Sequence, residues 1–122
     1  QMITTVSSEV DSDTSFAEVL KSAFPMGSMT GAPKIRAMEL IEEFEEFKRG
    51  IFSGAVGYIT PSSDFDFNVV IRTILYNLAT NYLSVGVGGA ITIKSDEQDE
   101  YEECLIKAKP IFDVLKFTLD EK

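Results

Sequence analysis

Residues 27–39 read Gly-Ser-Met-Thr-Gly-Ala-Pro-Lys-Ile-Arg-Ala-Met-Glu, a glycine-rich loop that leads into a helix. The apolar side chains of that helix recur every three or four residues, at Ile35, Met38, Leu40, Ile41 and Phe44. Proline near a helix start, this spacing and the later Gly50 predict an amphipathic helix that ends at Gly50. The charged residues 42–49 are interpreted as its solvated face.

The loop itself has two interpretations. Its glycines and hydroxyls can form a tight turn that caps the helix, or its free amides and the two following cations can bind an anion. A nucleotide-binding P-loop is excluded, because the glycines are four residues apart and the lysine follows a proline.

In the remaining chain, the spacing of apolar residues changes between that of a helix and that of a strand. Residues 1–7 predict a strand, and residues 16–24 predict a short helix capped by Thr14 or Ser15. Residues 52–60, 66–75 and 82–93 predict three antiparallel strands in a meander. Ser95 is expected to cap a last helix, from residue 95 to about 119, that Pro110 kinks or interrupts. The predicted fold class is α+β, an antiparallel sheet with flanking helices in one domain, residues 1–122.

Composition narrows the possible functions. The 122 residues carry a net charge of -9, which disfavours nucleic acid as a partner. With no histidine and only Cys104, a Cys/His zinc site, an internal disulfide and Ser/His or Cys/His nucleophile pairs are impossible. We therefore expect a hard metal such as magnesium, if any, and a reducing, cytoplasmic environment. No secretory signal and no membrane-spanning run is predicted.

Two regions carry candidate chemistry. Glu100, Glu103 and Lys107 share one face of the last predicted helix, which is either a solvated face or a place for magnesium beside a carboxylate-bearing ligand. Arg72 lies inside an apolar strand, where its guanidinium must reach an edge or bind an anion. The glycine run 86–90 allows either a β-bulge or close approach of a ligand.

Together these segments resemble the chorismate-utilising family of aminodeoxychorismate and anthranilate synthases over nearly the whole chain. Residues 27–39 resemble the family signature, and a Gly-Ala-Val-Gly-Tyr strand at 54–58 and an Ile-Arg-Thr strand at 71–73 follow in the family's order. The glycine-rich strand and a final helix with the pattern Glu-x-x-Glu-x-x-x-Lys complete the match. The family fold is a layered α+β sandwich of two pseudo-symmetric halves, of which this chain would form about one.

The resemblance implies a role for each matched residue. Arg72 would bind the enolpyruvyl carboxylate of chorismate, and Lys107 and the amides of Gly88, Gly89 and Ala90 would hold carboxylates. Glu103 would ligate magnesium, with Glu100 close behind it. Counting from Arg72 instead aligns the glycines at 86–88, and we prefer the alignment at 88–90 because a longer hairpin at 77–81 explains the offset.

Within the family, Asp-Phe-Asn at 66–68 is similar to aminodeoxychorismate synthase component I. Phe52 stands where anthranilate synthases have a tyrosine, and Gln1 where they have a histidine. The resemblance then implies amination of chorismate to 4-amino-4-deoxychorismate for folate synthesis, with ammonia from a glutamine amidotransferase. Anthranilate synthase or a salicylate or isochorismate synthase relative stays open, as does a non-catalytic acidic α+β binding module.

The family's nucleophilic lysine segment and its first magnesium glutamate are expected upstream of Gln1, so no catalytic residue is assigned within this chain. We expect the chain to be a C-terminal fragment that is inactive alone and that self-associates through the apolar surface left open.

Overall fold

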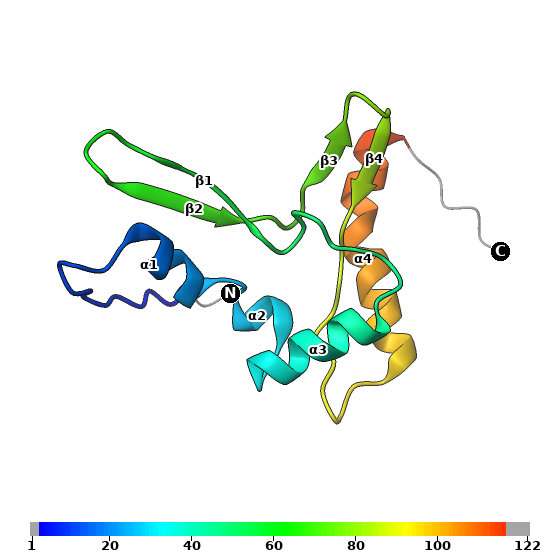
Figure 1. Cartoon of the computed structure of the whole chain (residues 1–122). Coiled ribbons are helices and arrows are strands. Elements are labelled where there is room, and N and C mark those ends of the chain that lie inside the picture. Colours follow the sequence, from blue (N-terminus) through cyan, green and yellow to red (C-terminus); the bar gives the residue numbers. More distant parts are fainter. Residues whose placement is uncertain (1–2, 117–122) are drawn as a thin grey trace.

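The computed structural model describes residues 3–116 (Figure 1). The elements follow in the order α1 (Phe16–Ala23), α2 (Gly27–Thr30), α3 (Lys34–Phe44), β1 (Ala55–Ile59), β2 (Phe65–Val69), β3 (Ile74–Asn77), β4 (Tyr82–Val85) and α4 (Glu97–Leu115). All strand pairs among them are antiparallel, so the predicted α+β class with an antiparallel arrangement is confirmed.

The first helix forms as predicted. The Ser15 hydroxyl accepts from the Glu18 amide while the Glu18 carboxylate accepts from the Ser15 amide, a reciprocal capping box, and the helix ends two residues before Pro25. The Phe16 ring lies 4.9 Å from that of Phe65 and 5.7 Å from that of Phe67 on β2. These aromatic contacts hold α1 against the first hairpin.

The predicted three-stranded meander is wrong, because the second strand is interrupted. β1 pairs with β2 and β3 pairs with β4, in two separate hairpins that project in different directions (Figure 1). Between them Arg72 adopts a left-handed conformation with φ 51°. This conformation lies outside the extended region that a strand needs, so the predicted second strand is interrupted there. The third predicted strand also ends early, at Val85, so the glycine run is not part of a ladder.

The predicted N-terminal strand is not formed among the described residues 3–7. Ile3 and Val6 are 94% and 88% exposed, and no strand of the described chain pairs with them. A strand gains its hydrogen bonds only from a neighbour, so β-branched composition alone cannot make one.

Both long helices differ from prediction at an end. α3 stops at Phe44, and Gly50 instead takes φ 60 in the loop that follows. The N-cap of α4 is Asp96, whose carboxylate accepts from the amides of Gln98 and Asp99, so the assignment of Ser95 as the cap was wrong. α4 continues through Pro110 to Leu115, and the predicted end near residue 119 lies outside the described residues.

The chain buries little of its apolar surface. Within residues 3–116 the buried residues are Val70, Ala108 and Ser53, and no side chain there is completely enclosed. The accessible surface is 10828 Å², whereas a compact monomer of 13.5 kDa exposes about 6500 Å². No helix among the described residues is both long and apolar enough to cross a membrane. The small buried cluster at Ser53 and Val70 lies where the loop after α3 meets the end of β2.

Candidate functional site

A pocket of about 460 Å³ is formed by segments far apart in the sequence. Its lining comes from α2, the loop after α3, the turn between the hairpins, the glycine run and α4. It includes Ser28, Met29, Glu45, Phe47, Arg49, Phe52, Ile71, Arg72, Lys107 and residues 86–91. Arg72, Gly88, Gly89, Ala90 and Lys107, which sequence reasoning singled out from three separate segments, therefore line one concavity.

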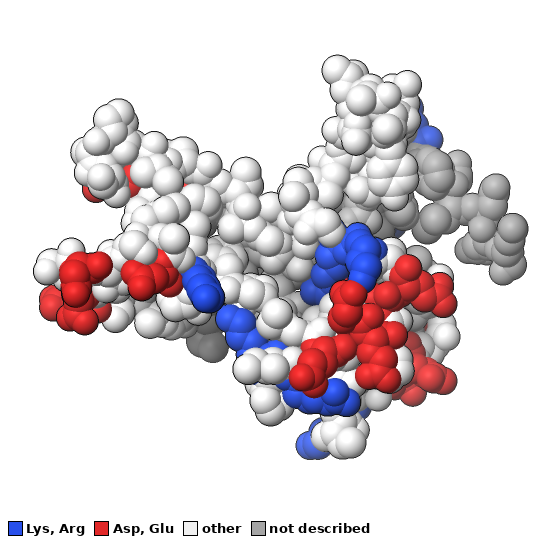
Figure 2. Space-filling model, in the orientation of Figure 1, with Lys and Arg blue, Asp and Glu red and all other residues white. Residues whose placement is uncertain are grey.

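The pocket has a positive lining although the chain is acidic. Its lining includes three cations, Arg49, Arg72 and Lys107, and a single carboxylate, Glu45. Figure 2 shows Lys and Arg atoms gathered near the middle of the molecule, bordered by acidic atoms. Such a local excess of positive charge attracts an anion whatever the net charge of the chain.

Arg72 owes its position to the break between the hairpins. Its residue is exposed, and within residues 3–116 its guanidinium makes no ion pair. The left-handed backbone turns it out of the apolar run and into the pocket lining. A planar fork of free donors is suited to bind a carboxylate with two hydrogen bonds.

Lys107 reaches the glycine run from α4. Its ammonium donates to the Gly88 carbonyl over 2.9 Å and forms an ion pair with Glu103 over 3.2 Å. An ammonium has three donors, so one remains for a ligand in the pocket. At the other end of the run, the ring of Phe52 packs over Gly86, where an added Cβ would lie 2.4 Å from the ring.

Glu100 and Glu103 lie behind the glycine run instead of in the pocket lining. An added Cβ on Gly89 would lie 2.5 Å from Glu100 Oε2 and 3.3 Å from Glu103 Oε2, so both carboxylates approach the same backbone. Glu100 Oε2 is buried and has no hydrogen-bond partner. An unpaired buried carboxylate oxygen beside a second carboxylate fits a hard divalent cation, which takes one or two protein carboxylates together with water or ligand oxygens. No group of three or more acidic or sulfur ligands that could hold a metal exists in residues 3–116.

Sequence reasoning missed Arg49 and Glu45. The interpretation of residues 42–49 as a solvated face is wrong for this pair, whose side chains are only 22% and 27% exposed. The Arg49 guanidinium donates to both Glu45 oxygens, to the Met29 carbonyl over 2.9 Å and to the Ser53 hydroxyl over 3.2 Å. The hydrogen bond between Arg49 and Glu45 lowers the pKa of the Glu45 carboxyl group and raises the pKa of the Arg49 guanidinium. The sequence signal was the i,i+4 Glu-to-Arg spacing in a run taken to be uniformly exposed.

The glycine-rich loop forms the short α2 and reaches the pocket only with Ser28 and Met29. Gly31 adopts φ 129 where the chain turns toward α3, and a Cβ there would lie 3.0 Å from that of Ala37. Lys34 and Arg36 do not line the pocket, and Arg36 pairs with Glu39 on the exposed side of α3. The tight-turn interpretation therefore describes most of the loop.

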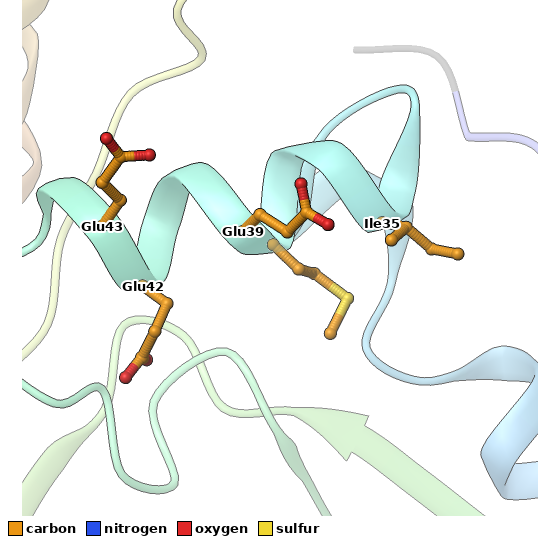
Figure 3. A pocket seen from close by; sticks show the side chains of 5 residues that line it. Ile35, Glu39, Glu42 and Glu43 are labelled. Atoms are coloured by element: carbon orange, nitrogen blue, oxygen red, sulfur yellow. The ribbon is translucent and has the colours of Figure 1, made fainter.

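A second hollow of about 550 Å³ lies on the surface of α3 (Figure 3). Its five lining residues, Ile35, Met38, Glu39, Glu42 and Glu43, all belong to that helix. The hollow has three carboxylates and no cation, so it is unsuited to an anionic ligand.

Comparison with known proteins identifies relatives over nearly the whole chain. Residues 1–113 match the family described as chorismate binding enzyme. The chain is 47% identical over 108 residues to the probable chloroplastic aminodeoxychorismate synthase of Oryza sativa and 44% identical over 115 residues to the aminodeoxychorismate synthase of Streptomyces griseus. These alignments cover 88% and 94% of the chain but only 12% and 16% of the relatives.

A relative with another named activity follows. The chain is 38% identical over 117 residues to anthranilate synthase component 1 of Acinetobacter calcoaceticus, covering 96% of the chain and 23% of the relative. The chain therefore spans less than a quarter of the length of each of these proteins.

Proposed function

Because the chain belongs to the chorismate-binding enzyme family, we propose that it supplies the anion-binding part of an active site that converts chorismate to 4-amino-4-deoxychorismate. One observation carries the proposal: Arg72 and Lys107, from the turn after β2 and from α4, line one pocket with the backbone of residues 88–90. Chorismate carries two carboxylates, and two separated cations beside exposed amides are suited to that pattern.

In this proposal Arg72 binds the enolpyruvyl carboxylate through its free fork. Lys107 and the amides of residues 88–90 hold the second carboxylate. The contacts of Gly88 with Lys107 and of Gly89 with the two glutamates support this alignment of the glycines, since Gly86 is covered by Phe52. Preorganised donors of this kind lower the energy of charge that develops during the reaction without having to reorient.

Glu100 and Glu103 would hold magnesium at the back of the glycine run. When bound there, the ion would supply positive charge to neutralise a carboxylate and assist departure of the hydroxyl group. Lys107 pairs with Glu103 and contacts Gly88, so it fixes one of the two metal-binding carboxylates relative to the glycine run.

The proposed reaction displaces the C4 hydroxyl of chorismate by ammonia, which a glutamine amidotransferase would deliver. In this proposal the residues of the pocket bind and orient the substrate. The cytoplasmic location expected from the sequence stays a prediction.

Anthranilate synthesis is the second candidate, supported by the similarity to anthranilate synthase component 1. Phe67 is a weak discriminator of the product, because its ring packs against Phe16 and lies over Gly57. Phe52 is a better one, since it lines the pocket.

Chorismate binding and product analysis of the complete enzyme to which the proposal assigns this chain test the proposal. We expect Arg72→Lys, which keeps the charge but loses the fork, to raise the KM for chorismate without changing the metal dependence. Arg36→Lys makes the same chemical change at an exposed ion pair and should leave KM unchanged. Equal KM values for both variants would contradict the binding role of Arg72, and anthranilate as the product would favour the second candidate.

A further inference from the structure

Ser95 links the glycine run to the first turn of α4, although it is not the helix cap. Its hydroxyl oxygen accepts from the Thr92 amide over 3.0 Å. Its single proton has three acceptors within reach, Glu100 Oε1 at 2.7 Å, Thr92 Oγ1 at 3.3 Å and the Ala90 carbonyl at 3.4 Å. The shortest, charge-assisted bond to Glu100 is the strongest one.

This bond determines which oxygen of Glu100 is left free. With Oε1 engaged by Ser95, Oε2 is the buried oxygen without a partner. It lies on the same side of the Gly89 backbone as Glu103 Oε2. Without the hydroxyl, the carboxylate could rotate about its last torsion, which is broad for this side chain, and lose that orientation.

We propose that Ser95 is a positioning residue that holds Glu100 so that Oε2 faces a cation shared with Glu103. The inference rests on the proposed function for the identity of the cation, magnesium. Loss of a hydrogen-bond partner of a metal-binding carboxylate commonly lowers metal affinity about 10- to 100-fold, because the partner fixes the orientation of the carboxylate before the metal binds.

Binding of Mn²⁺ to the full chain, followed by electron paramagnetic resonance and displaced by Mg²⁺, tests the proposal without relying on activity. The key comparison is Ser95→Thr against Ser95→Val, which have the same shape and differ in the hydroxyl. We expect the Val variant to bind Mn²⁺ about 10- to 100-fold more weakly and the Thr variant to bind like the parent. Should Val prevent folding, judged by thermal unfolding, Ser95→Ala replaces it because it only removes an atom.

A matched control is available in the turn between β1 and β2. The Ser62 hydroxyl donates to the Asp64 carboxylate over 2.7 Å, the same type of bond far from α4. Ser62→Ala should leave Mn²⁺ affinity unchanged. In a Glu100→Gln background, loss of the Ser95 hydroxyl should have no further effect, because Ser95 acts through Glu100.

The outcomes separate the two proposals. Equal Mn²⁺ affinity of the Val and Thr variants, or an undiminished effect of Ser95 in the Glu100→Gln background, overturns the role of Ser95 and leaves the proposed function intact. Absence of Mn²⁺ binding by the parent overturns both this inference and the magnesium assignment, while the Arg72 experiment still decides chorismate binding.

Discussion

Replacing Arg49 with Ala should loosen the segment that carries Ser28 and Met29 into the pocket. Arg49 connects this segment to the buried Ser53 through bonds to the Met29 carbonyl and the Ser53 hydroxyl, and Glu45 holds its guanidinium in place. The substitution leaves the Met29 carbonyl and the Glu45 carboxylate without their donor. We therefore expect local opening of residues 26–31 to become easier, with the rest of the fold retained.

The size of the effect follows from the contacts. A hydrogen bond to a charged group contributes about 1.5 to 3 kcal/mol, and partial exposure of this pair favours the lower part of that range. A loss of about 2 kcal/mol corresponds to an opening equilibrium about 30-fold more favourable. Arg49→Lys keeps the charge without the fork and should give a smaller effect.

Hydrogen exchange of the full chain measures this directly. The amides of Thr30 and Gly31, which donate to the carbonyls of Met26 and Gly27, should exchange about 30-fold faster in Arg49→Ala. Arg36→Ala removes an arginine from an exposed pair with Glu39 and serves as the control. Unchanged exchange at both amides in Arg49→Ala would refute the bridging role.

The same pair predicts a pH dependence. The pKa of Glu45 is lowered in the folded chain, chiefly by its hydrogen bond from Arg49. The stabilisation is therefore complete above the ordinary glutamate pKa of 4.5 and is lost as pH falls through the lowered folded value. The protection factor at Thr30, which corrects the exchange rate for the intrinsic effect of pH, should fall in that acidic window, and Glu45→Gln should remove this fall. An identical pH profile in Glu45→Gln would assign it to another group.

Three further predictions concern other parts of the chain. Gly89→Ala should impair Mn²⁺ binding because the added Cβ meets Glu100 Oε2 at 2.5 Å, whereas Gly88→Ala, with nothing within 4 Å, should be tolerated; equal binding by both would contradict the close approach. Ser15→Ala should cost α1 about 1 kcal/mol, seen as faster exchange in that helix, and unchanged exchange would show that the cap contributes nothing. The isolated 122-residue chain should form no aminodeoxychorismate from chorismate, ammonia and magnesium and should sediment as an oligomer; product above a no-protein control, or a compact monomer, would contradict this.

Local rules predicted the helices well and the strands less well. α1 begins after Ser15 and ends before Pro25, because capping and the missing backbone donor of proline act within one turn. The break at Arg72 could not be predicted, since alternation of residue types does not reveal a left-handed backbone in an apolar run. The strand expected at residues 1–7 is not formed among the described residues 3–7 for a related reason: pairing depends on a neighbour that composition cannot supply.

The candidate site, too, could be predicted only in part from local patterns. The segments around Arg72, residues 88–90 and Lys107 were identified from their motifs, and the structure brings them to one pocket. Arg49 was missed because its bonds reach Met29, 20 positions earlier in the chain, and no periodic pattern encodes such a contact. The hydroxyl of Ser95 was assigned to the helix end because its spacing matched a capping box, whereas Asp96 takes that position.

At position 72 the left-handed backbone favours glycine, whereas the proposed binding of a carboxylate needs the side chain of arginine. A residue with a Cβ costs about 1 to 2 kcal/mol in this conformation, and glycine would adopt it freely. Glycine would also remove the guanidinium, which can bind a carboxylate with two hydrogen bonds. Conformational stability and the carboxylate binding proposed for Arg72 therefore favour different residues at position 72.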